Sequence, residues 1–516
     1  MATRGYLGID CGTQGLSVIF TDEDLTVLGV GEGSYDMVPD LEDECYEQLP
    51  EDWTAALVVA MGDLRAKLTA SGTDMEVLAI GISGQMHGEV LADAEGKSLG
   101  PARLWCDSRN EAEGHELTER FGTKMPKRAT ATRWLWTIRN QTEKATQVRH
   151  MTTPAGWIAR QLTGQWMLGI GDAAGMFPID QSSLDYDQSR LAQFDELVAD
   201  FDVAPLHQLL PTVRKAGEDA GTLDSVGATL LGLPEGIPVA PAEGDQPAAL
   251  TGSLIGEAGL VSCSFGTSVC ANSVGDRQFQ GVSEAVDHFC APDGKPINMV
   301  CLRNGTTYMN SVVEMFGEVL DGDVAASFAA LMPRLLEADE DCGGILALPF
   351  MDDEPGLGVS RGGTAMVVGL NSENATPGNV VKAALLSTMF NLRLGSEDMD
   401  AQGYPRTELV LTGGLTRTPE LAQILADVFQ TPVSMPESAE EGTAWGAALM
   451  AKYRYNKING ATEDWAAFLA SQSAGESKRF EPNATSVAKY EATYQRYKRL
   501  ISVQNALDAA LLATKE

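Results

Sequence analysis

Basic residues and long apolar runs are scarce in this chain. Its 516 residues include 37 Lys and Arg against 72 Asp and Glu, for a formal net charge of −35. This excess of negative charge argues against nucleic acid and anionic membranes as partners. No stretch approaches the ~18 continuous apolar residues that a membrane span requires. The N-terminal run MATRGYLGID enters a strand-like stretch at once, which leaves no room for a signal peptide. We therefore expect a cytoplasmic protein.

Cysteine is also sparse and unpatterned. The eight cysteines include no CxxC pair and no spacing typical of metal ligands, and several lie in apolar stretches. This pattern excludes a zinc-ribbon type of site and a disulfide framework. It predicts reduced thiols.

The length of the chain exceeds what one hydrophobic core can hold, so we expect two or three domains. The content of 44% hydrophobic and 21% charged residues is that of an ordinary globular protein.

Two segments half a chain apart share one plan. YLGIDCGTQGLSVIFTD (6–22) and LVSCSFGTSVCANSV (260–274) each contain an apolar run, a Gly-Thr turn and a second apolar run. Each predicts a β-hairpin. Gly12 and Gly266 are 254 positions apart, and both regions continue with alternating strand and helix patterns. The repeat indicates two duplicated α/β domains, which we place at 1–250 and 251–516.

Other elements fit this plan. We expect strands at 77–83 and 408–415 and helices at 51–68, 379–394, 419–429 and 442–453.

Three glycine turns are suited to binding phosphate, because glycine lets several backbone N–H groups approach an anion closely. They are DCGTQG, SFGTSV and TGGL, with the candidate residues Gly12, Thr13, Gln14, Gly266, Thr267, Gly413 and Gly414. If the two halves face each other, these turns enclose one cleft for a nucleotide such as ATP. Asp10 ends a strand beside the first turn, where it is well placed to hold Mg²⁺ through water.

Polar residues at two further strand ends are suited to binding a sugar. GISGQMHGEV places Gln85, Met86 and His87 after a buried strand, and ARLWCDSRN offers Asp107 and Arg109. Ligands bind at strand ends in α/β folds. Together, these residues supply the donors, acceptors and apolar wall that a polyhydroxylated molecule needs.

The order GIDCGTQG, SGQMHG, WCDSR, DAAG, GDQ, SFGTS and TGGL resembles the FGGY carbohydrate kinases, and QMHG is most similar to the xylulokinases among them. The resemblance covers the chain to about residue 452. It implies two ribonuclease-H-like (actin-like ATPase) domains around a central cleft, with ATP and Mg²⁺ as cofactors. It also implies a small-molecule sugar as partner, with a homodimer as a candidate assembly.

The resemblance assigns roles to Asp245 and Gln246 in PAEGDQPAAL. Asp245 matches the general base that takes the proton from the sugar hydroxyl, and it shares the metal with Asp10. Gln246 stands where asparagine is usual, beside the substrate. Glu243 is the rival candidate for the base.

The resemblance implies phosphorylation of a ketose. The leading candidate is the conversion of D-xylulose to D-xylulose 5-phosphate. Departures leave the sugar open between xylulose, ribulose and sedoheptulose. They are the stretch 348–363, the helix at 379–394, Gln246 and Cys106. A non-catalytic sugar sensor with an actin-like fold is the alternative from another class.

Overall fold

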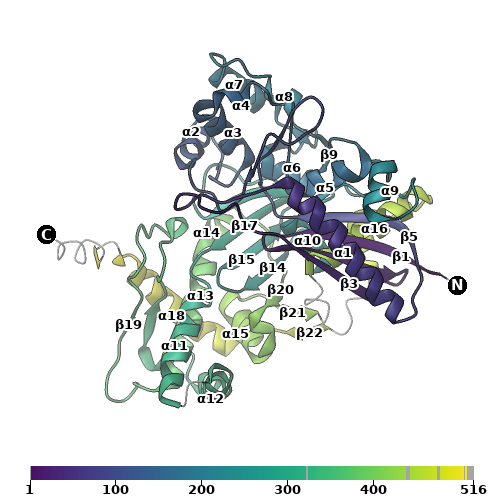
Figure 1. The fold of residues 1–516 in the computed structure, drawn as a ribbon. Coiled ribbons are helices and arrows are strands. Elements are labelled where there is room, and N and C mark those ends of the chain that lie inside the picture. Colours follow the sequence, from purple (N-terminus) through teal and green to yellow (C-terminus); the bar gives the residue numbers. More distant parts are fainter. Residues whose placement is uncertain (1, 321–322, 437–441, 473–476, 505, 508–516) are drawn as a thin grey trace.

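The computed structural model describes residues 2–320, 323–436, 442–472, 477–504 and 506–507. Two sheets form its centre, one from each half of the chain, and helices cover them (Figure 1). Among the described residues, no helix is both long and apolar enough to cross a membrane.

The first sheet has the order β13-β5-β1-β2-β3. Its strands are β1 (Thr3–Cys11), β2 (Gly15–Asp22), β3 (Val27–Ser34), β5 (Met75–Gly84) and β13 (Glu243–Gly244). The pair β1–β2 is antiparallel, whereas β5 runs parallel to both β1 and β13. Helix α1 (Pro50–Ala70) covers one face through a large apolar cluster.

The second sheet repeats this arrangement. Its order is β16-β17-β15-β14-β20-β21-β22, with the strands β14 (Leu260–Phe265), β15 (Val269–Val274), β16 (Val286–Cys290), β17 (Pro296–Leu302), β20 (Glu408–Gly413), β21 (Val433–Pro436) and β22 (Ser477–Phe480). Strands β14 and β15 form an antiparallel hairpin, and β20 lies parallel to β14, as β5 lies to β1. Both predicted hairpins are therefore confirmed. The order β13-β5-β1-β2-β3 recurs in the second sheet as β21-β20-β14-β15-β17.

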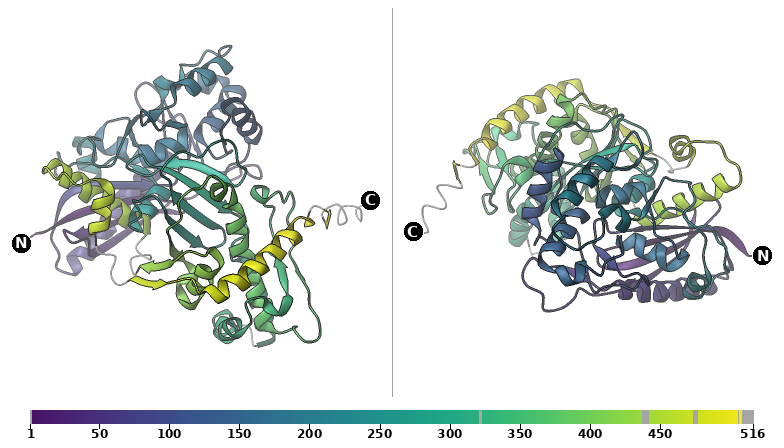
Figure 2. Two further views of the ribbon diagram at one scale, coloured as in Figure 1. Left: turned by 180° about the vertical axis from the view of Figure 1, so that it is seen from behind. Right: turned by 90° about the horizontal axis from the view of Figure 1, so that it is seen from above.

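The predicted helices are confirmed as well. They appear as α1, α13 (Pro377–Gly395), α15 (Glu420–Phe429) and α16 (Gly442–Ile458). Helix α13 shares an apolar cluster with the strands of the second sheet, together with α11 (Thr307–Gly317), α12 (Val324–Glu337) and α18 (Ala484–Ile501). Further helices gather in a lobe at one end of the molecule (Figures 1 and 2). They are α2 (Glu111–Phe121), α3 (Thr130–Asn140), α4 (Thr142–Ala145), α7 (Gln188–Leu197) and α8 (Leu206–Leu209).

Two helices cross between the halves. Helix α16 comes from the second half of the chain but packs on β1 and β5 of the first sheet. Helix α10 (Asp245–Gly252) spans the boundary that we placed at residue 250, and its Leu250 packs against β15 and β17 of the second sheet. The two helices touch at Gly446, where a Cβ atom would lie 2.0 Å from the Ala248 carbonyl oxygen. The exact division of the chain into domains stays a prediction.

We expect Gly446→Ala to destabilise the protein by roughly 1–3 kcal/mol, the cost of overpacking a close contact. The matched control is Gly62→Ala in the middle of α1, where nothing lies within 4 Å of the new Cβ atom. Because alanine has the higher helix propensity, the control should gain up to about 1 kcal/mol. Urea denaturation of both variants would measure the two effects, and a stabilised Gly446→Ala protein would contradict the close packing of α10 on α16.

Two features differ from a simple interpretation of the sequence. The apolar run GIPVAPA at 236–242 has the composition of a strand, yet it pairs with β5 only at Val239, and strand β13 covers only Glu243 and Gly244. The prolines Pro238 and Pro241 explain this, since they have no N–H group to donate to a neighbouring strand. The cysteines are not all reduced thiols, because Cys270 and Cys301 are joined by a disulfide across β15 and β17.

Candidate active site

Asp10 lies near the end of β1, immediately before the first glycine turn. Its carboxylate accepts hydrogen bonds from the hydroxyls of Ser83 on β5 and Thr443 on α16, both at 2.6 Å. Strand register explains the first contact, because Asp10 is paired with Ser83. The second ties the first half of the chain to Thr443, 433 positions later, in the first turn of α16.

Buried amide side chains hold the first glycine turn, DCGTQG, in place. Gln85 is 1% exposed; its side chain accepts from the Thr13 hydroxyl (3.2 Å) and donates to Gln48 (2.9 Å). Gln48 in turn donates to the Thr13 carbonyl at 2.8 Å. The indole N–H of the half-exposed Trp105 donates to the Thr13 hydroxyl at 3.0 Å. Gln85 therefore positions the turn, whereas Gln14 at its tip is exposed.

The second and third turns lie side by side. Gly266 and Thr267 are exposed, and their carbonyls accept hydrogen bonds from the N–H groups of Thr306 and Gly305. Gly413 is paired with Phe265 at the end of β14 and has a φ of +78°. Glycine tolerates this left-handed backbone, which keeps the exposed Gly413–Gly414 turn against the second hairpin.

Three acids gather where β13 meets α10. Asp245 is half-buried at the first position of α10. Burial, together with the negative charge of Asp10, raises its pKa to about 7. Burial also raises the pKa of Asp172 to about 8.

Glu243 is held by the protein itself. Its carboxyl accepts from the N–H groups of Gly171 (3.2 Å) and Asp172 (2.9 Å), and it is 1% exposed. Burial raises its pKa well above the usual range, and the neighbouring Asp172 adds to the rise. Asp245 therefore remains the more accessible of the two candidate bases.

His87 presents one ring nitrogen for binding. Its Nδ1 lies 2.9 Å from the Gly175 carbonyl oxygen, so this nitrogen carries the hydrogen and donates. Burial lowers the pKa of His87 to about 3, and the charge of Arg128 contributes. The imidazole is therefore neutral and its Nε2 is an acceptor. Met86 lies between His87 and the base, since a Cβ atom on Gly175 or Gly244 would touch its side chain.

Asp107 and Arg109 form a supporting network. Asp107 is fully buried and accepts from Arg109 Nη2 at 2.7 Å and from the Tyr46 N–H at 3.0 Å. Burial alone would raise the pKa of Asp107, but these hydrogen bonds lower it below its usual value. Arg109 also pairs with Glu47 at 2.5 Å. The charges of Asp107 and Arg109 are thus both paired within the protein. Only the part-exposed guanidinium edge of Arg109 is left for a ligand.

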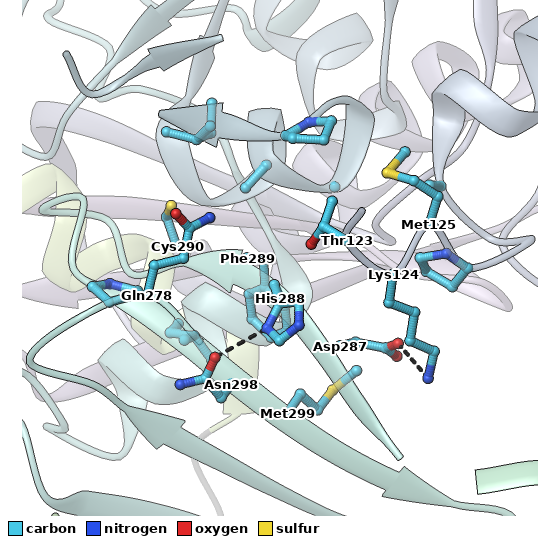
Figure 3. Close-up of a pocket in the computed structure, with 18 of the residues that line it drawn as sticks. Thr123, Lys124, Met125, Gln278, Asp287, His288, Phe289, Cys290, Asn298 and Met299 are labelled. Atoms are coloured by element: carbon cyan, nitrogen blue, oxygen red, sulfur yellow. Dashed lines mark hydrogen bonds and ion pairs between the residues drawn. The ribbon is translucent and has the colours of Figure 1, made fainter. Parts of the chain in front are cut away.

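A cavity of about 50 Å³ lies between the two halves (Figure 3). His87 and the loop 123–129 form one wall, and β16 and β17 form the other. Lys124 and Asp287 form an ion pair across it at 3.0 Å, and Arg128 pairs with Asp287 as well. Ligand pockets commonly exceed about 300 Å³. The cavity is therefore smaller than a typical ligand pocket, and the ion pairs join the two halves of the chain beside it.

Comparison with protein families settles the membership of the chain. Residues 5–252 match the N-terminal domain of the FGGY family of carbohydrate kinases, and residues 261–455 match the C-terminal domain. The chain belongs to the FGGY family of carbohydrate kinases. The resemblance seen in the motifs is thereby confirmed, and so is the expectation of a kinase that acts on a sugar.

Relatives of this FGGY protein include xylulose kinases. That of Haemophilus influenzae is 28% identical, covering 95% of this chain and 98% of the relative. That of Streptomyces coelicolor is 30% identical, covering 78% and 79%. A solved xylulose kinase structure from Rhodospirillum rubrum superposes with a TM-score of 0.82 at 20% identity, covering 97% and 99%. The structural likeness confirms the predicted two-domain, actin-like fold.

Sequence reasoning missed several groups around the FGGY site. Thr443 lay in a segment expected only to be a helix with small residues, and nothing in the sequence connects it to Asp10. Asp172 was noticed within a family motif but was given no role. Its Oδ2 accepts from the Thr153 hydroxyl at 2.5 Å, while its buried Oδ1 has no protein partner. The negative charge of Asp245 adds to the rise in the pKa of Asp172, because β13 ends beside α6 (Ile170–Met176).

Proposed function

We propose that this chain transfers the terminal phosphoryl group of ATP to a ketose, with D-xylulose as substrate and D-xylulose 5-phosphate as product. The observation that carries the proposal is the half-buried Asp245, which starts α10 near enough to Asp10 for the two charges to interact. The xylulose kinases among its relatives support the choice of sugar.

In this proposal Asp245 accepts the proton of the sugar's terminal hydroxyl as that oxygen bonds to the γ-phosphorus. The bond from the γ-phosphorus to the β,γ-bridging oxygen breaks, and ADP leaves. Phosphoryl transfer depends mainly on positioning and charge stabilisation. The N–H groups of Gly12 and Gly266 donate to the Gly15 and Ser268 carbonyls and close their turns. Other N–H and hydroxyl groups of the turns, such as those of Thr13 and Thr267, would hold phosphate oxygens in the cleft, and closure of the halves would exclude water.

A Mg²⁺ ion fits the acidic pair Asp10 and Asp245. The charge of Asp10 raises the pKa of Asp245, and a cation between two carboxylates relieves that repulsion. Among the described residues, no cluster of three or more His, Cys, Asp or Glu side chains could hold a metal alone. This suits Mg²⁺, which binds one or two carboxylates together with water and substrate phosphates. When bound, the ion would neutralise charge on the transferring phosphoryl group.

The pKa of Asp245 predicts the pH dependence. Only the ionised carboxylate can accept a proton, so kcat/KM for the sugar should fall tenfold per pH unit below about pH 7. In the pH profile of kcat, the fall in rate should occur at a lower pH, because bound Mg²⁺ favours the ionised carboxylate of Asp245. Rates measured from about pH 5.5 to about pH 8.5 would test this. A kcat/KM that stays constant below pH 6 would contradict the assignment of Asp245 as the base.

His87→Asn should weaken sugar binding selectively. The residue has a φ of +68°, which Asn tolerates, so the variant removes the acceptor Nε2 without backbone strain. Loss of one hydrogen bond to a neutral hydroxyl costs roughly 0.5–1.5 kcal/mol, about two- to tenfold. KM for the ketose should rise by this factor while kcat and KM for ATP stay nearly constant.

The matched control is His115→Ala on the exposed surface of α2, which should leave every constant unchanged. If His87→Asn lowers kcat/KM equally for all sugars and also lowers the melting temperature, His87 has a structural role instead.

An ADP-release assay with xylulose, ribulose, sedoheptulose and glycerol tests the proposed activity. The highest kcat/KM is expected for D-xylulose. A preference for ribulose or sedoheptulose would change the proposed substrate but leave the proposed kinase activity in place. Sugar binding without ADP release would support the sensor alternative.

A further inference from the structure

Four small side chains form a row across the second sheet. Thr412, Ser264, Cys270 and Cys301 are in register on β20, β14, β15 and β17. All four are part-exposed, whereas their strand neighbours Phe265, Val269 and Leu302 point to the other face and lie in the core. Successive side chains of a strand point to opposite faces. The row therefore lies on the face of the sheet opposite that core.

This face looks toward the proposed catalytic base. Asn272, two residues beyond Cys270 on β15, donates from Nδ2 to Gln246 Oε1 at 3.1 Å. Gln246 is the residue after Asp245. One strand step is ~3.3 Å, so Cys270 lies about 7 Å from Asn272, on the side of the phosphate turn 266–268. The row thus lies between the start of α10 and that turn.

Cys270 and Cys301 differ from the other cysteines. Their Cα atoms lie 4.2 Å apart and their sulfurs are bonded. Of the remaining six, Cys11, Cys263, Cys290 and Cys342 are buried, and only Cys45 and Cys106 are part-exposed. The bonded pair is part-exposed. It joins two strands that lead to the phosphate turn and to Gly305, whose N–H donates to that turn.

We propose that, within this row, Cys270 and Cys301 form a thiol–disulfide exchange site, which low-molecular-weight disulfides oxidise and low-molecular-weight thiols reduce. In the oxidising direction, the thiolate of one cysteine attacks a reagent disulfide RSSR. This attack forms a mixed disulfide and releases RS⁻. The thiolate of the second cysteine then attacks the protein sulfur of the mixed disulfide and releases a second RS⁻. The two cysteine protons pass to the two leaving thiolates, so the protein is oxidised by two electrons and RSSR becomes two RSH.

The position of Cys270 and Cys301 predicts how chemical modification of their sulfurs affects kinase activity. A bulky adduct on either sulfur would stand where the proposed substrates must pass between the base and the phosphate turn. The internal disulfide adds no atoms to the cleft, so it should protect the site from such adducts. The activity part of this inference rests on the proposed function, whereas the exchange chemistry does not.

The test uses the full-length protein, reduced with dithiothreitol or oxidised with oxidised glutathione, then labelled with N-ethylmaleimide and mapped by peptide mass spectrometry. Cys270 and Cys301 should be labelled only after reduction, while Cys45 and Cys106 are labelled in both states. Labelling of the reduced protein should lower kinase activity by about tenfold or more, and prior oxidation should prevent most of that loss. ATP analogue with ketose should slow labelling of the pair.

Cys270→Ser and Cys301→Ser, each checked by circular dichroism, should abolish formation of the disulfide, and Cys45→Ser should leave it intact. A pair that stays labelled after oxidation, or unlabelled after reduction, would overturn the exchange site. Equal inactivation of a Cys270→Ser, Cys301→Ser double variant would assign the activity loss to another thiol, such as Cys106, and overturn the placement of the pair between α10 and the phosphate turn. If the reduced wild type phosphorylates no ketose, the proposed function fails while the mass mapping still decides the exchange site.

Discussion

Asp245→Asn should lower kcat for ketose phosphorylation by roughly 10²–10⁴-fold, the usual contribution of general-base catalysis. The amide has the shape of the carboxylate but cannot accept the hydroxyl proton. Affinity for ATP should change little, because the phosphate turns lie on β1–β2, β14–β15 and β20 and are not altered. Steady-state kinetics, with nucleotide titration calorimetry, would measure both effects.

Glu243→Gln is the matched control. Glu243 is two residues from Asp245, yet burial raises its pKa well above the usual value and both of its carboxyl oxygens accept from backbone N–H groups. Glu243 has no oxygen free to take a sugar proton, whereas the amide removes one of its two backbone acceptors. The cost is that of about one hydrogen bond, so kcat should fall less than about tenfold. If Asp245→Asn keeps a tenth of the wild-type rate while Glu243→Gln is inactive, Glu243 is the base.

Asp10→Asn should lower kcat/KM by about 10²-fold or more, because charge stabilisation by a bound cation is worth several kcal/mol and each 1.36 kcal/mol is tenfold. The Mg²⁺ concentration for half-maximal rate should rise as well. The variant keeps an oxygen that can accept one hydroxyl hydrogen bond, so the fold should persist. Activity measured as a function of Mg²⁺ concentration separates the two effects.

Ser83→Ala provides the comparison for Asp10→Asn. It removes one hydrogen bond from the Asp10 carboxylate but leaves its charge. The rate should fall less than tenfold, in line with a single hydrogen bond of roughly 0.5–1.5 kcal/mol. Equal losses in the two variants would mean that Asp10 acts by holding β1 against β5 and not through its charge.

Local patterns predicted the frame of this molecule well. The two Gly-Thr hairpins have alternating apolar residues and a turn, so strand, turn and strand follow from the residues alone. Their spacing implied the duplication, which the strand orders confirm. The ends of β1 and β5 follow from the same patterns, and this places Asp10 and His87 near one edge of the sheet.

Contacts between distant segments could not be predicted. Thr443 reaches Asp10 only because α16 returns to the first sheet, and a Gly446 Cβ atom would clash only because α10 crosses there. The pairing of Cys270 with Cys301 depends on the register of β15 with β17, and no spacing in the sequence encodes that register. The buried settings of Asp172 and Glu243 likewise appear only after the halves are packed.

We expect this chain to phosphorylate D-xylulose at carbon five with ATP. Phosphorus–proton correlated NMR of the reaction of full-length protein with Mg-ATP and D-xylulose tests this directly. The phosphorus signal should be coupled to the protons on carbon five, with one ADP formed for each sugar phosphate. Inorganic phosphate without a sugar phosphate, or phosphorus on another carbon, would contradict it.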